Sequence, residues 1–283
     1  MISGTLALGL GLAGVSALST AVAHALLKFG DDKLAVQAWV RLTELVLFAP
    51  LAVWLGPPPA SLWPWLVAAA LIHAVYQVVL IGSYHWNDFA VGFPIARGTA
   101  PLLTALGGSL WLGDRLGPGQ WAGIALIVAA IAVLALTRRV RALGLVTAIG
   151  AGTLTCAYSL VDAGGMRAAP SVTMFLAWFY LADSLSMPLL FLALRPRALW
   201  RANMASTARV GLGAGLGAVI SFTPALIAFR FAPAGAVAAI RETSVVGAMI
   251  ASRSLLGEAP GWRHWLAALG VTLGAILLVF QTP

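Results

Sequence analysis

The sequence FPIARGTAPLLTALGGSLWLGDRLGPGQWAGIAL, residues 93–126, contains two apolar runs separated by a short turn of glycine, aspartate and arginine. The first run is apolar for about twenty residues, the length that an α-helix needs to cross a bilayer at about 1.5 Å per residue. The second continues to residue 137. A strand of a membrane β-barrel would instead alternate in polarity over about ten residues. The stretch therefore predicts two membrane-spanning helices joined by a tight turn.

The rest of the chain has the same character. Of its 283 residues, 61% are apolar, 17 are Lys or Arg and 9 are Asp or Glu, and the mean hydropathy is +0.95. A soluble domain needs far more polar surface, so this composition predicts an all-α integral membrane protein. Glycine, proline and arginine clusters divide the apolar runs. We expect about ten helices, near 4–27, 34–55, 62–83, 90–112, 119–137, 142–161, 172–194, 207–230, 234–256 and 263–281.

The basic residues gather on one predicted side of the membrane. The net charge is +8, and with the N-terminus outside, eleven Lys and Arg residues fall at the cytoplasmic side against three at the outer side. Cytoplasmic loops carry the excess of Lys and Arg, so we expect a multi-pass protein of the cell (inner) membrane with both termini outside. Cytoplasmic termini are the alternative. This distribution indicates the lipid bilayer, and no nucleic acid, as the surroundings of the basic residues.

The two halves of the chain resemble each other at fixed spacings. The matched pairs are Arg97 with Arg241 and Asp114 with Glu258 at an offset of 144 residues, and Trp39 with Trp178 and Glu44 with Asp183 at an offset of 139. Because each half holds five helices, an odd number, the second copy must insert upside down, as in many secondary transporters. We predict a first repeat at 1–139 and a second, inverted repeat at 140–283, with a substrate site between them. The alternative is chance similarity between apolar segments.

The ends of the two halves also resemble a known family. The sequence 93–126 and its counterpart AIRETSVVGAMIASRSLLGEAPGWRHWLAAL at 239–269 are similar to the helix 4–5 and helix 9–10 signature of the EamA-type family of the drug/metabolite transporter (DMT) superfamily, with a Leu-Gly-acid turn at 112–114 and 256–258. The resemblance covers essentially the whole chain and implies a transporter built from inverted repeats. It leaves the substrate open, because the family covers amino acids, other metabolites and drugs. One departure is Ala100, where many members carry an acidic residue.

Two arginines lie deep in the predicted membrane and are candidates for substrate binding. A charge near the bilayer centre costs about 2.5–3.5 kcal/mol on the insertion scale, so it needs a reason. Arg97 and Arg241 each lie about 6 Å from the midplane, on opposite sides, where they could bracket an anionic group. Pro101 would free the carbonyl of Arg97 as an acceptor. Pairing of both arginines with carboxylates is the alternative. Glu242 is expected to line the cavity or to pair with another helix.

Two further deep carboxylates are candidates for proton coupling. Arg41 and Glu44 lie three residues apart on one helical face and are expected to pair. Asp183 has no basic partner in its own helix, because the position that matches Arg41 is Tyr180. A buried carboxylate without a partner could carry a coupling proton. Hydrogen bonding of Asp183 to a neighbouring helix is the alternative.

Aromatic and amide side chains complete the predicted site. Tyr76 and Gln77 form a polar stripe with His73, which suits either interhelical hydrogen bonds or the wall of a pocket. The other candidates for contact with a substrate are Trp39, Trp178 and Tyr180. The candidate hinges for alternating access are the prolines inside helices, Pro50, Pro101, Pro188 and Pro224. His24 and Asp162 end the first helix of each repeat, where we expect solvated side chains.

No motif in the sequence indicates an enzyme or a cofactor. There is no P-loop, no HExxH and no GxSxG, and the four histidines are too scattered to predict a metal site. We expect a secondary transporter, an exporter or permease of a small polar metabolite that is anionic or zwitterionic. Export of an organic cation by the deep carboxylates is the alternative, followed by a channel or a membrane sensor. The GxxxG patterns at 211–217 predict close packing within the fold or, alternatively, a homodimer.

Overall fold

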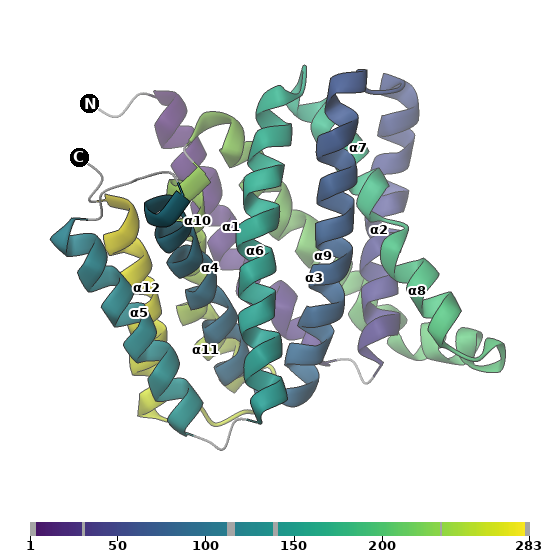
Figure 1. The fold of residues 1–283 in the computed structure, drawn as a ribbon. Coiled ribbons are helices and arrows are strands. Elements are labelled where there is room, and N and C mark those ends of the chain that lie inside the picture. The colour runs from purple at the N-terminus through teal and green to yellow at the C-terminus, as the bar shows by residue number, and fades with distance from the viewer. Residues whose placement is uncertain (1–3, 30–31, 112–116, 138–140, 233, 281–283) are drawn as a thin grey trace.

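The described part of the chain is entirely helical. The computed structural model describes residues 4–29, 32–111, 117–137, 141–232 and 234–280, and these ranges contain no strand. Figure 1 shows the helices side by side in one bundle. The α-helices are α1 (Gly4–Phe29), α2 (Lys33–Leu55), α3 (Trp63–Trp86), α4 (Phe89–Trp111), α5 (Pro118–Thr137), α6 (Ala142–Ala168), α7 (Val172–Asp183), α8 (Ser186–Leu194), α9 (Trp200–Phe231), α10 (Ala234–Glu242), α11 (Ser244–Ser254) and α12 (Trp262–Phe280). The 3-10 helices are η1 (Ala60–Leu62) and η2 (Arg197–Leu199).

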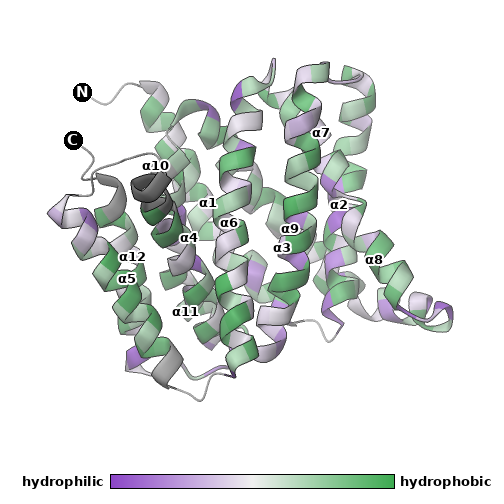
Figure 2. Cartoon of the chain, viewed as in Figure 1, coloured by the Kyte–Doolittle hydropathy of each residue, from purple (hydrophilic) through white to green (hydrophobic). Residues whose placement is uncertain are grey.

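Long apolar helices mark a membrane-embedded protein. Among the described residues, six helical segments have the length and hydropathy to cross a membrane. These segments are Gly4–Lys28, Lys33–Leu55, Ala60–Trp86, Ala142–Ala168, Val172–Leu194 and Arg197–Phe231. Hydrophobic residues cover most of the helix lengths in Figure 2, and hydrophilic residues gather near helix ends and inside the bundle. The helical content and these six apolar segments agree with the expectation of an all-α membrane protein.

The predicted helix at 172–194 is broken in the middle. α7 ends at Asp183 and α8 begins at Ser186, so the expectation of one continuous helix is wrong. Pro188 gives the physical reason, because its ring has no N–H for the carbonyl of Ser184, four residues earlier. This candidate hinge therefore coincides with a real interruption. The other three candidate hinges lie inside uninterrupted helices, at Pro50, Pro101 and Pro224.

The predicted helix at 234–256 is also interrupted. After Glu242, the last residue of α10, Thr243 bonds back to the Ile240 carbonyl through its N–H at 3.1 Å and its hydroxyl at 2.6 Å. Such local bonding competes with the regular helical pattern, and α11 begins only at Ser244. Both interruptions therefore come directly after an acidic residue.

Two helices extend beyond their predicted ends. α9 begins at Trp200 and not at 207, and α6 ends at Ala168 and not at 161. The apolar runs mark only the part of a helix that suits the membrane, whereas backbone hydrogen bonding continues into the polar residues on either side. Hydropathy therefore places these helices correctly but underestimates their lengths.

The helices pack in a regular pattern. α1 packs along α9, α6 packs along α3 and α4, and α5 packs along α12 at one edge of the bundle (Figure 1). α9 approaches α2 closely, because Gly211 faces Trp39 and Gly215 faces Thr43. A side chain at either glycine would overlap its neighbour in α2. These two glycines of the 211–217 pattern are thus used within the fold, as expected.

The Leu-Gly-acid turn at 256–258 joins three helices at one end of the bundle. Gly257 has φ +64, a left-handed conformation that favours glycine, and the Glu258 carboxylate that follows it accepts four hydrogen bonds. Its donors are the Ser252 hydroxyl at 2.6 Å, the N–H groups of Phe89 at 2.8 Å and Ala90 at 3.0 Å, and the Lys28 ammonium at 2.9 Å. The carboxylate also lies at the N-terminus of α4, where negative charge is favoured. The matching turn at 112–114 lies outside the described residues.

We expect the stability that Glu258 provides to depend on pH. Partial burial works against ionisation, but the hydrogen bonds from Ser252, Phe89 and Lys28 outweigh it and hold the pKa of Glu258 below its ordinary value of 4.5. The ionised form therefore stabilises the fold at neutral pH, and this contribution is lost as the pH falls through that lowered pKa. Glu258→Gln should lower stability at pH 7 by about 1.5–3 kcal/mol, measured by thermal unfolding in detergent. The difference between the two proteins should shrink as the pH falls from 4.5 through the lowered pKa of Glu258; a constant difference at every pH would contradict the assignment.

Candidate functional site

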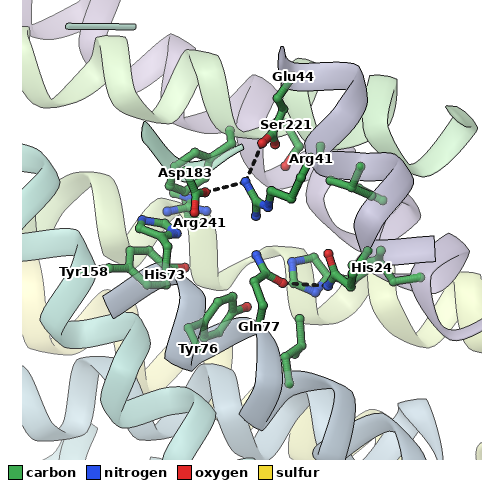
Figure 3. A pocket seen from close by; sticks show the side chains of 17 residues that line it. His24, Arg41, Glu44, His73, Tyr76, Gln77, Tyr158, Asp183, Ser221 and Arg241 are labelled. Atoms are coloured by element: carbon green, nitrogen blue, oxygen red, sulfur yellow. Dashed lines mark hydrogen bonds and ion pairs between the residues drawn. The ribbon is translucent and has the colours of Figure 1, made fainter. Parts of the chain in front are cut away.

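A polar cavity lies in the middle of the bundle. Its volume is about 70 Å³, and its walls come from α1, α2, α3, α6, α7, α9 and α10. The polar side chains around it in Figure 3 are His24, Arg41, Glu44, His73, Tyr76, Gln77, Tyr158, Asp183, Ser221 and Arg241. Because about 10–15 Å³ of such volume is enough to hold one water molecule, a cavity of this size holds several waters or one small polar group. Of the predicted site residues, Tyr76, Gln77, Glu44, Asp183 and Arg241 meet here.

Arg41 holds two carboxylates together in the cavity wall. Its Nη1 donates to Oε2 of Glu44 in α2 and to Oδ2 of Asp183 in α7 (Figure 3). All three residues are at most 5% exposed. The predicted pairing of Arg41 with Glu44 is confirmed. Asp183 is not unpaired, because its basic partner comes from another helix, which sequence spacing within one helix cannot reveal.

Arg241 lines the same cavity without a carboxylate partner. It is 3% exposed, and its guanidinium carbon lies 5.2 Å from the centre of the Phe222 ring. Its Nε has no hydrogen-bond partner, and no ion pair of Arg241 is found among the described residues. A buried guanidinium stays charged. The cavity wall therefore presents a cation that no neighbouring carboxylate neutralises through direct contact.

Arg97 and Glu242 lie behind the cavity wall. Arg97 Nη1 is 3.7 Å from Glu242 Oε1, and the guanidinium carbon of Arg97 lies 5.2 Å from the ring centre of Phe93. The terminal nitrogens of Arg97 and Oε2 of Glu242 have no hydrogen-bond partner in the described chain. The structure thus brings only Arg241 of the predicted arginine bracket to the cavity, and it places Arg97 in a loose ion pair.

The three predicted aromatic contacts point elsewhere. The Trp39 indole N–H donates to the Met204 carbonyl at 2.9 Å, and the Trp178 indole N–H donates to the Gly56 carbonyl at 2.9 Å. Tyr180 shares a hydrogen bond of 2.8 Å with Thr223 and stacks on Phe48. None of the three lines the cavity. In this state they join helices to one another and do not contact a bound solute.

Several cavity residues were not predicted as binding residues. His24 Nδ1 lies 2.6 Å from the Tyr84 hydroxyl. Gln37 donates to Gln77 at 2.6 Å. The stripe of His73, Tyr76 and Gln77 in α3 was the available signal, and the structure places all three in the wall of a pocket. The unpredicted polar and aromatic residues that line the cavity are His24, Gln37, Arg41, His73, Tyr158, Ser221 and Phe222.

The expectation that Asp162 lies at a solvated helix end is wrong. The residue is 0% exposed. α6 continues for six residues beyond it, to Ala168, so Asp162 lies inside the helix. Its Oδ2 lies 3.1 Å from Nε2 of His73. The cavity is therefore backed by a second buried polar pair.

Comparison with known proteins identifies the fold alone. No protein-family model matches the sequence, and no curated protein matches it. Twenty-six chains of solved structures match. One of them, described only as a crystal structure of a protein, has a TM-score of 0.62 and 18% sequence identity, and the match covers 99% of this chain and 98% of that chain. The described residues therefore share their helical arrangement with a solved structure, and a function can be argued only from the cavity.

We expect Arg41→Gln to destabilise the protein strongly. Removal of the guanidinium leaves two buried carboxylates without their cation, which costs about 3–5 kcal/mol. Asp183→Asn in the Arg41→Gln background should recover part of this loss, because one of the uncompensated charges is gone. Thermal unfolding of both single variants and the double variant, at neutral pH in detergent, measures this coupling. Arg253→Gln, at an exposed position, is the control. Additive losses in the double variant would contradict the pairing.

Proposed function

We propose that the protein is a secondary transporter of the cell (inner) membrane that binds a small polar metabolite in the central cavity and moves it by alternating access. The observation that carries this proposal is the buried guanidinium of Arg241, which faces the cavity without an ion-pair partner among the described residues. A buried charge without a partner is costly. A bound anionic group would remove that cost, so the cavity has the chemistry of a binding site.

The arrangement of the helices supports the inverted repeat. In the proposed repeat, α1 to α5 correspond in order to α6, α7 with α8, α9, α10 with α11, and α12. If the two halves are equivalent, each contact between helices should recur between their counterparts. α1 contacts α9, and their counterparts α6 and α3 also contact each other. In the same way α6 contacts α4, and their counterparts, α1 and the pair α10 and α11, are also in contact. This two-fold pattern supports ten crossings and the EamA-type, DMT-like architecture that the sequence resembles.

The position of the cavity between the halves supports alternating access. Its walls take three helices from the first half and four from the second, so a relative movement of the halves would change access to it. His24, Leu27 and Gln37 extend the cavity toward the end where α1 stops and α2 begins. That end carries Lys28 and Lys33, and by the positive-inside rule we assign it to the cytoplasm. The structure then corresponds to a state whose site lies nearer the cytoplasm.

The proposed substrate carries a carboxylate, phosphonate or similar anionic group. Arg241 supplies an unpaired cation for it, and Ser221 and Gln77 supply hydrogen-bonding groups in the same cavity. A zwitterion would place its ammonium near Glu44 and Asp183. The second candidate is an organic cation, which is favoured by the two carboxylates that share the single Arg41.

We expect small anions or zwitterions to stabilise the purified protein against heat through Arg241. A ligand that binds only the folded state stabilises it by about 2.7 kcal/mol at one hundred times its dissociation constant. The panel is L-lactate, methanesulfonate, inorganic phosphate, glycine, choline and tetramethylammonium. Stabilisation by an anion or by glycine should disappear in Arg241→Gln and persist in Arg263→Gln, a control at an exposed position of α12.

The alternative has a distinct outcome in the same panel. Stabilisation by choline or tetramethylammonium alone, lost in Asp183→Asn and retained in Arg241→Gln, would replace the anion proposal with an organic-cation exporter. A stabilising compound is then tested for flux into proteoliposomes. Saturable uptake with a defined turnover is expected of alternating access, whereas flux that rises without saturation indicates a channel.

A further inference from the structure

A second buried titratable pair lies beside Arg41 and Arg241. His73 Nε2 is 3.1 Å from Asp162 Oδ2, and the two residues are 3% and 0% exposed. The His73 ring stacks on Tyr158 with the ring centres 4.4 Å apart, and both rings line the cavity (Figure 3). Oδ1 of Asp162 has no hydrogen-bond partner in the described chain. His73 can therefore take up a proton, and it lies beside a carboxylate with only one of its two oxygens hydrogen-bonded.

The buried charges of the described residues do not balance. The buried arginines are Arg41, Arg97 and Arg241, and the buried carboxylates are Glu44, Asp162, Asp183 and Glu242. With all of them ionised and His73 neutral, this set sums to one negative charge. An anion that entered alone would double the excess in a low-dielectric interior, which is unfavourable. An anion that entered together with one proton would leave the excess unchanged.

We propose that His73 and Asp162 form a proton-binding site that fills when an anion binds at Arg241. This inference rests on the proposed function, which it deepens by naming the coupling ion and its carrier. A carboxylate only accepts hydrogen bonds, so neutral His73 carries its hydrogen on Nε2 and donates it to Asp162. The proton arrives from cavity water at Nδ1 and converts the ring to an imidazolium beside the carboxylate. Release to water restores the neutral ring.

The surroundings of the pair favour this assignment over the other carboxylates. The titratable and charged groups that face it are Arg41 and Glu44 from α2, Tyr76 from α3, Tyr158 from α6, Asp183 from α7 and Arg241 from α10. α9 contributes Phe222, whose ring centre lies 5.5 Å from that of His73. Glu44 and Asp183 already share Arg41, so their negative charge is partly neutralised in the structure. No arginine in the described part of the chain lies in hydrogen-bond contact with Asp162, and His73 is its hydrogen-bond partner.

His24 is the other histidine among the described residues that line the cavity. A comparison of its surroundings with those of His73 shows which of the two can bind a proton. Its Nδ1 meets the Tyr84 hydroxyl at 2.6 Å and its ring contacts Phe93 edge to face. A neutral tyrosine can satisfy a neutral imidazole, and it offers no charge to stabilise an imidazolium. Of the two cavity histidines, His73 alone therefore has the partner that proton binding requires.

The first test is the pH dependence of anion affinity. Methanesulfonate and L-lactate keep a constant charge between about pH 6 and 8, the range in which histidine ordinarily titrates. We expect the affinity of the wild type to fall as the pH rises, approaching tenfold per pH unit, the limit for one coupled proton. His73→Gln and Asp162→Asn should abolish this dependence, and His85→Gln, at an exposed position of the same helix, should keep it. A wild-type affinity that does not change with pH, or a dependence that survives in His73→Gln, overturns the proposal.

The second test needs neither a ligand nor a variant of the pair. Nitrogen-15 spectra of histidine-labelled protein in lipid nanodiscs report each ring's protonation, and His73 is identified by elimination with His24→Gln, His85→Gln and His264→Gln. We expect His73 to change between its neutral and protonated states between about pH 5 and 8. A His73 ring that stays in one state throughout overturns the proposal. If no anion binds but His73 titrates, the proposed anion transport fails while the proton site stands.

Discussion

Each buried charge in this apolar bundle needs a partner of opposite charge, and the rest of the structure depends on this constraint. Apolar contacts between helices discriminate poorly between partners in lipid, because the lipid chains are equally apolar. Charged groups do discriminate, since each must find a partner or remain costly. Arg41 connects α2 to α7 through Asp183, and Arg97 connects α4 to α10 through Glu242. These two contacts specify which helices of the first half face which helices of the second.

The helix interruptions increase that constraint. Asp183 and Glu242 are the last residues of α7 and α10, where the helix dipole is negative and a carboxylate is disfavoured. Each acid therefore needs a cation more strongly than it would within a continuous helix. The free backbone groups at each break are accommodated locally, by the Ser184 hydroxyl with Leu181 and by Thr243 with Ile240. The interruptions thus occur where the bundle is polar and would be unfavourable against lipid.

The sequence predicts the helices and the deep charges but not how they meet. Apolar runs place the described α-helices but not the two interruptions, because crossing a membrane requires a minimum apolar length. Pro188 marks one interruption, whereas nothing comparable marks Thr243. The inward face of a helix that is apolar all round cannot be identified from its periodicity. Gln37 and Trp39, two residues apart in α2, show the consequence: the amide lines the cavity and the indole packs against Gly211.

The asymmetry between the matched halves has a mechanical consequence for the proposed cycle. Glu44 and Asp183 occupy matching positions, but the position that matches Arg41 is Tyr180, so one guanidinium serves acids from both halves. The Arg41–Glu44 contact lies within α2 and survives any rigid movement of that helix. The Arg41–Asp183 contact crosses from one half to the other, so in the proposed cycle a movement that separates the halves on this side would break it. The ammonium of a bound zwitterion, placed near Asp183, would replace Arg41 as its partner and lower the cost of that step, so occupancy of the cavity would then control the movement.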